Sequence, residues 1–111
     1  MTWPQSVRFM TVYIAGPMTG LPKQNYPAFN AAAARLRALG YEVLNPVDSE
    51  AENHKKGPQS HAWYMRRAVR MVSHADGIAL LPGWEKSAGA ALEVQIGRAL
   101  ELEIQTLGGW V

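Results

Sequence analysis

The sequence lacks cysteine, which excludes disulfide bonds and thiolate chemistry and is compatible with a reducing compartment. No apolar run approaches the roughly 20 residues that span a bilayer. The first six residues lack the charged and apolar regions of a signal peptide. From these absences we expect a soluble, cytoplasmic protein that has no membrane partner.

Charge is also scarce, since charged residues make up 18% of the chain and the formal net charge is +2. The pI of about 9.2 therefore reflects a small imbalance, and we expect no nucleic-acid partner. The three histidines, His54, His61 and His74, have no i, i+4 spacing with one another. A dedicated metal site is therefore not expected.

The length of 111 residues and the apolar content of 48% suffice for one domain with its own core, spanning residues 1–111. Apolar runs of strand length alternate with segments of helical period, and this alternation is typical of a parallel sheet that is covered on both faces. We predict an α/β fold: a single flavodoxin-like or Rossmann-like three-layer domain with a parallel sheet of four or five strands.

Strands are predicted at about residues 9–15, 41–44, 77–81 and 103–107, and helices at about 27–39 and 62–73 and from Ser87 to about 102. Residues 47–60 have no period, and we interpret them as a flexible loop that could act as a lid. Apolar spacing predicts the buried positions of each helix. These positions are Phe29, Ala32, Ala33, Leu36 and Leu39; Met65, Ala68, Val69 and Val72; and Leu92, Ile96, Ala99 and Leu100.

One carboxylate, Glu93, lies within the first turn and a half of the helix that Ser87 is suited to cap. The positive end of a helix favours the ionised carboxylate, which suits a nucleophile at an anomeric carbon. The alternative is that Glu93 is simply a charge at a helix border. Loops that contain glycine follow the predicted strands at 9–15 and 77–81. Ligands of open α/β sheets bind beyond the carboxyl ends of the strands, where both loops lie.

Two motifs, YIAGP at 13–17 and Ser87-x-Gly89-x-x-x-Glu93, resemble the nucleoside 2-deoxyribosyltransferase superfamily, which includes deoxynucleoside 5′-monophosphate N-hydrolases. The segments AGPMTG (15–20) and LPGWEKSAGA (81–90) are similar to a small branch met in phage and bacterial genomes. The likeness extends over about residues 12–102, nearly the whole domain.

The resemblance implies catalysis by Glu93, which would attack C1′ of the sugar and release the base, with Tyr13 close to it. It implies a small-molecule nucleoside or nucleotide as ligand, no cofactor, and a homo-oligomer. Serine at position 87 is similar to the monophosphate hydrolases, whereas the members that use nucleosides carry an acidic residue there. The other residues expected to bind substrate are Gly16, Met18, Thr19, Gly20, Trp84 and Gly89.

The sequence departs from the family at Ala68, where relatives carry an aspartate that assists protonation of the leaving group. Its loss could cost on the order of 10² to 10⁴ in rate if no other group serves as the acid. His61, Tyr64 and Asp48 are the possible substitutes. This departure leaves open a nucleotide-binding or sensor module without catalysis. A third possibility is a structural or partner-binding protein in which Trp84 and the arginine face make the contacts.

Several residues permit two interpretations. Trp84 could stack on a base or pack against a neighbour, and Asp76 is more often a connector than a catalytic residue. The segment 63–65 is expected to pack in a core or an interface. Three arginines are expected on a solvated helix face, with phosphate binding or a subunit contact as alternatives. These are Arg66, Arg67 and Arg70.

Overall fold

The computed structural model describes residues 10–48 and 59–111, and within these ranges four parallel strands form one sheet. The strands are β1 (Thr11–Ala15), β2 (Glu42–Leu44), β3 (Gly77–Leu80) and β4 (Glu103–Thr106), in the order β2-β1-β3-β4. Tyr13 of β1 aligns with Leu44 on one side and with Ile78 on the other. The predicted α/β fold and parallel sheet are therefore confirmed. The expected lid falls mostly outside the described residues.

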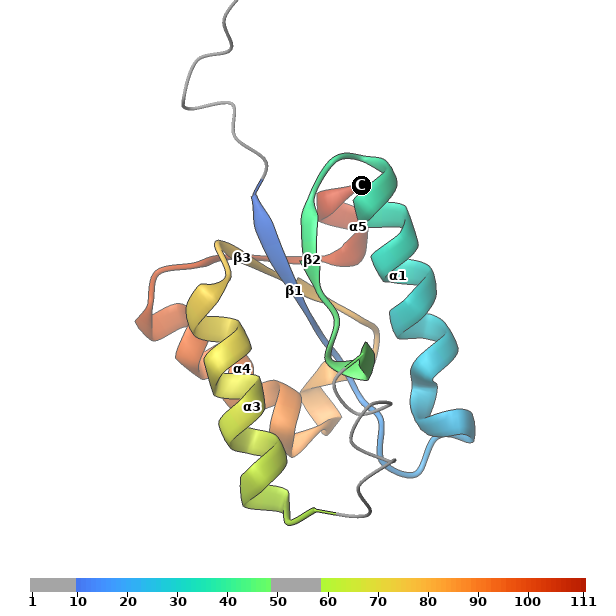
Figure 1. Cartoon of the computed structure of the whole chain (residues 1–111), viewed down its shortest axis with the longest axis vertical. Coiled ribbons are helices and arrows are strands. Elements are labelled where there is room, and N and C mark those ends of the chain that lie inside the picture. Colours follow the sequence, from blue (N-terminus) through green and yellow to red (C-terminus); the bar gives the residue numbers. More distant parts are fainter. Residues whose placement is uncertain (1–9, 49–58) are drawn as a thin grey trace, which may run out of the picture.

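Helices cover both faces of the sheet (Figure 1). On one face lie α1 (Tyr26–Ala38) and the short α5 (Leu107–Trp110), and on the other lie α3 (His61–His74) and α4 (Ala88–Ala99). Short 3-10 turns, η2 (Pro22–Asn25) and η4 (Trp84–Lys86), precede α1 and α4. No helix of the described ranges is both long and apolar enough to cross a membrane.

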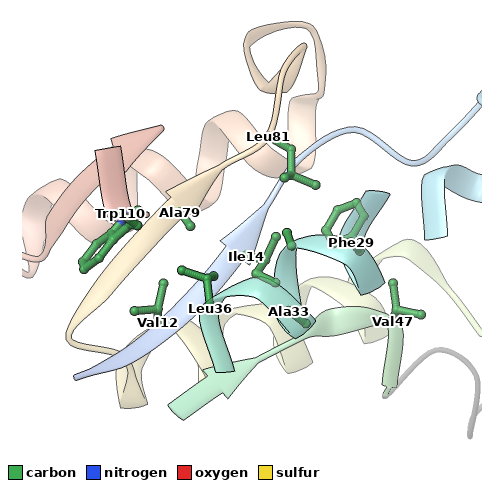
Figure 2. Packing of buried hydrophobic residues seen from close by; sticks show 10 residues of the cluster. Val12, Ile14, Phe29, Ala33, Leu36, Val47, Ala79, Leu81 and Trp110 are labelled. Atoms are coloured by element: carbon green, nitrogen blue, oxygen red, sulfur yellow. The ribbon is translucent and has the colours of Figure 1, made fainter. Parts of the chain in front are cut away.

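The central strand β1 has its last four residues buried, as expected for a parallel strand that is covered on both faces. Val12 and Ile14 point toward α1, where they pack with Leu36 and Phe29 (Figure 2). Tyr13 belongs to a second core cluster, which lies on the side of α3 and α4. This second core cluster consists of Tyr13, Ala15, Val72, Ala75, Ile78, Leu80, Ala90 and Val94. The alternation along β1 thus directs Val12 and Ile14 toward α1 and Tyr13 toward α3 and α4.

The first two helices bury most of the positions that apolar spacing predicted. The four predicted residues within α1 are buried, whereas Leu39 is exposed because α1 ends at Ala38. On α3, Ala68 and Val72 are buried and Met65 is half-buried, but Val69 is exposed.

The buried side predicted for α4 is largely wrong. Leu92 and Leu100 are 42% and 48% exposed and Ala99 is exposed, so that only Ile96 of the predicted set packs against the core. The buried side instead consists of Ala90, Glu93, Val94 and Gly97. Small residues let the helix approach the sheet closely, since a Cβ on Gly97 would lie 2.5 Å from Ile78 Cδ1.

The C-terminal end of the domain also differs from prediction. Helix α4 stops at Ala99 and not near 102, because Glu101 adopts the left-handed conformation (φ 58°) before β4 begins. The unpredicted α5 then buries Trp110, whose Nε1–H donates to the Ile78 carbonyl at 2.9 Å. The Trp110 ring lies so close to Gly77 that a Cβ there would be 2.4 Å from Cη2.

The amino edge of the sheet is held together by Asp76. Its carboxylate accepts from the Thr11 amide at 2.8 Å, while its own amide donates to the Thr11 carbonyl at 2.7 Å. Its carbonyl accepts from the Glu103 amide at 3.2 Å. Asp76 therefore joins the starts of β1 and β4 next to β3, which agrees with its interpretation as a connector.

Candidate active site

A cavity of about 340 Å³ opens at the carboxyl edge of the sheet. Its walls come from β1 and the loop after it, from η2 and the start of α1, from Pro46 after β2, from α3 and from the N-terminal half of α4. This is the edge at which parallel α/β sheets bind their ligands, and the volume falls within the range of small-molecule sites.

Glu93 lines this cavity although the residue is only 7% exposed. Tyr13, which is buried in β1, donates its hydroxyl hydrogen bond to Glu93 Oε2. Burial of a carboxylate is costly unless it is hydrogen-bonded, so this contact helps to keep Glu93 in place. The geometry brings together the two residues that the sequence paired as nucleophile and neighbour.

The N-terminus of α4 forms the adjacent wall. Ser87 caps the helix, since its Oγ accepts from the Ala90 amide at 3.2 Å. Ser87, Gly89 and Ala90 all line the cavity. The positive end of the helix dipole therefore lies at the cavity surface, where it favours a negatively charged group.

The loop after β1 contributes Gly16, Met18 and Thr19 to the cavity. Gly16 is required by packing, because a Cβ at this position would lie 2.8 Å from Leu81 Cβ. Gly20 is exposed and does not line the cavity, and neither does Trp84. Trp84 packs instead against the second core cluster, which is the second of its two interpretations.

Two of the three possible acids reach the cavity. His61 and Tyr64, from the first turn of α3, line it. Asp48 does not line it; its carboxylate lies 3.6 Å from Arg37 Nη2 in an exposed ion pair. Ala68, 8% exposed, lines the cavity at the position where the resembling family carries aspartate.

Arg67 departs from the expected solvated helix face. Arg66 and Arg70 are exposed as predicted, but Arg67 is half-buried and lines the cavity. Its guanidinium carbon lies 4.8 Å from the centre of the Trp63 ring, a cation–π contact. Its Nε is buried and has no hydrogen-bond partner among the described residues.

The sequence matches the family described as a domain of unknown function (DUF4406) over residues 10–106. The chain belongs to this family. No curated protein matches the DUF4406 chain.

Within residues 10–48 and 59–111, no group of three or more histidines and acidic residues could hold a metal ion.

Among solved structures, the DUF4406 chain is similar to a protein described as "2-desoxiribosyltransferase from Leishmania mexicana". The two share 22% sequence identity with a TM-score of 0.67. The alignment covers 87% of this chain and 63% of the other, so the DUF4406 chain spans less than two thirds of the length of that protein. At this identity the likeness establishes a common fold.

Most of the site residues named from the sequence of the DUF4406 chain meet at one cavity, but the sequence did not name all of its lining. The unnamed lining residues include Trp63, Met65 and Arg67 of α3 and Gln24, Tyr26 and Phe29 of η2 and α1. Trp63 and Arg67 stand four residues apart, a spacing that places side chains next to each other on a helix. That spacing was the signal for their contact, but it does not tell which face of α3 is buried.

Proposed function

We propose that this DUF4406 chain cleaves the N-glycosidic bond of a deoxynucleoside or its 5′-monophosphate, with Glu93 as the nucleophile. The observation that carries the proposal is the buried Glu93 carboxylate, which is hydrogen-bonded to Tyr13 and lines a cavity at the carboxyl edge of the sheet. The fold shared with a 2-desoxiribosyltransferase supports the same chemistry.

In the proposed reaction a carboxylate oxygen of Glu93 forms a bond to C1′ as the bond from C1′ to the base nitrogen breaks. The electron pair of that bond leaves with the base. Water, or a second base that bears an N–H, then attacks C1′, and the bond from C1′ to the carboxylate oxygen breaks while the attacking group loses its proton to solvent. The products are those of hydrolysis or transfer respectively. The hydrogen bond from Tyr13 would hold the carboxylate in position throughout.

The start of α4 supports a 5′-phosphate on the substrate. Ser87 and Gly89 line the cavity at the positive end of the helix. Because position 87 is a serine and not an acidic residue, it does not repel a phosphate. Gly16 and Thr19 line the cavity from the loop after β1. We infer a relationship to the monophosphate N-hydrolases and to the phage and bacterial branch on the motifs that contain these residues.

Protonation of the departing base requires a group other than residue 68, because Ala68 cannot supply a proton. His61 and Tyr64 line the cavity and are the candidates for this role. Ala68 also favours a second function, a nucleotide-binding module that retains the cavity and has no catalytic activity. The two functions differ in a single outcome, which is whether bound nucleotide is consumed.

The test is a chromatographic assay for free base after incubation with deoxynucleosides and their 5′-monophosphates. We expect release from at least one substrate by the wild type, and loss of release in Glu93→Gln, which keeps the shape of the side chain. Equal release by both proteins would overturn the mechanism. Saturable binding without release by the wild type would establish the binding module, and absence of binding would leave a structural role.

Self-association stays a prediction and is checked by light scattering of the purified protein. The assay above should be run at several protein concentrations. If the site needs residues of a second copy, the specific activity will rise with protein concentration.

A further inference from the structure

The proposed mechanism assigns no task to Arg67. Its Nε is buried without a hydrogen-bond partner in the described part of the chain, and no described carboxylate forms an ion pair with it. A buried N–H of a cation without a partner is unfavourable. Arg67 also lines the cavity, so its guanidinium group can donate a hydrogen bond to an acceptor on a ligand that binds there.

The place of Arg67 on α3 separates it from the wall formed by α4. Met65 contacts that wall, since its Sδ lies 3.8 Å from where a Cβ of Gly89 would be. Each residue turns an α-helix by about 100°, so Arg67 leaves α3 about 200° around from Met65. Arg67 and Ser87 therefore belong to different parts of the cavity lining.

The proposed function gives these two parts different occupants. If the sugar and phosphate lie against Ser87 and Gly89, the base occupies another part of the cavity, and the wall that carries Trp63 and Arg67 is the part that offers a cationic donor. As the glycosidic bond breaks, its electron pair moves onto the base, and in bases with a ring carbonyl this charge is shared with the oxygen. A cationic N–H donor at that oxygen favours the charged leaving group.

We propose that Arg67 binds a carbonyl oxygen of the leaving base and so selects substrates whose base carries a ring carbonyl. This inference rests on the proposed function. Thymine, uracil, cytosine, guanine and hypoxanthine meet the requirement, and adenine does not. Arg67 keeps its own proton, and the base takes up a proton from His61, Tyr64 or water, so that no acid at position 68 is required.

The contact with Trp63 makes arginine suited to this task. The indole ring lies against the guanidinium and restricts its orientation, so that its N–H groups are directed before the substrate binds. A lysine at this position would keep the charge but lose the planar set of donors. The proposal therefore predicts that charge alone restores only part of the function.

The experiment compares base release from deoxyinosine and deoxyadenosine 5′-monophosphates, whose bases differ in having an oxygen or an amino group at C6, together with thymidine 5′-monophosphate. In Arg67→Met we expect kcat/KM for thymidine and deoxyinosine monophosphates to fall about 10- to 100-fold. For deoxyadenosine monophosphate we expect a fall of less than about threefold. Arg67→Lys should lie between Arg67→Met and the wild type. Arg66→Met, which removes a neighbouring exposed arginine, is the matched control and should behave as the wild type does.

Binding provides a second measurement. Calorimetry with the same nucleotides compares the single variant Glu93→Gln with the double variant that also carries Arg67→Met. The double variant should bind the carbonyl-bearing nucleotides more weakly and the adenine nucleotide equally well. An equal loss of binding for all bases, or no loss for any, overturns the role of Arg67. The proposed function still stands in that case if the wild type releases base and Glu93→Gln does not. Absence of both release and binding overturns both proposals.

Discussion

The hydroxyl of Tyr13 on β1 donates a hydrogen bond to the carboxylate of Glu93 on α4, although 80 positions of sequence separate the two residues. The contact joins the central strand to the helix above it at the carboxyl edge. It links the orientation of Glu93 to the position of β1, which is one of the two inner strands of the sheet.

Replacing Tyr13 by phenylalanine tests the importance of this contact. The ring that fills the core is kept and only the hydroxyl is lost, so we expect kcat for base release to fall about 10- to 100-fold. Steady-state kinetics measures this, and thermal unfolding of the same variant reports the structural cost. A variant with unchanged kcat would show that Glu93 does not need Tyr13 for catalysis.

Ser87 caps α4, and the proposed function also places it next to the substrate phosphate, so different substitutions can separate these two roles. Ser87→Ala removes the cap of α4 and should lower the free energy of unfolding by about 1 kcal/mol. Ser87→Asp keeps a capping oxygen but puts a negative charge at the cavity wall, so it should raise KM for monophosphates and favour nucleosides. The ratio of kcat/KM for the two substrate classes provides the measurement. If Ser87→Asp leaves that ratio unchanged, the phosphate does not lie near Ser87.

Ala68→Asp would place a carboxyl group where the resembling family has one. If transfer of a proton to the base limits the rate, we expect base release to rise by about 10- to 100-fold. Ala68→Asn has nearly the same shape without the acid and is the matched control. A similar gain in both variants would assign the effect to polarity in the cavity and not to proton transfer.

Gly77→Ala should be destabilising because there is no room for a Cβ at the start of β3. The added carbon would lie 2.4 Å from Trp110 Cη2 and 2.8 Å from the Glu103 carbonyl oxygen. We expect a loss of about 1–3 kcal/mol in the free energy of unfolding, measured by denaturant titration. Gly108→Ala is the control, since its Cβ would come no closer than 3.9 Å to another residue. Equal stability of the two variants would mean that α5 can move away from the sheet at little cost.

The sequence predicted the order and type of the main elements because their signals are local. Ser87 and the glycine that follows α1 mark helix ends directly, and the run from Gly77 to Leu80 consists of small and apolar residues. The end of α4 was harder to predict. Its left-handed residue is Glu101, where a glycine would have provided the expected signal.

The buried side of α4 and the Arg67 wall could not be predicted from periodicity. Apolar spacing gives the greatest weight to Leu92 and Leu100, whereas the sheet accepts only small side chains at the point of closest approach, around Gly97. Arg67 looks like a surface residue next to Arg66 and Arg70. Its burial depends on the orientation of α3 relative to the cavity, which is a tertiary property.

The two edges of the sheet therefore offer separate opportunities to an engineer. Asp76 joins the starts of the strands at the amino edge, whereas Glu93 and Arg67 line the cavity at the carboxyl edge. Asp76 does not line the cavity, so substitutions near it can be screened for stability without altering the cavity lining. A library confined to the carboxyl edge could change substrate choice on a scaffold that had already been strengthened at the other edge.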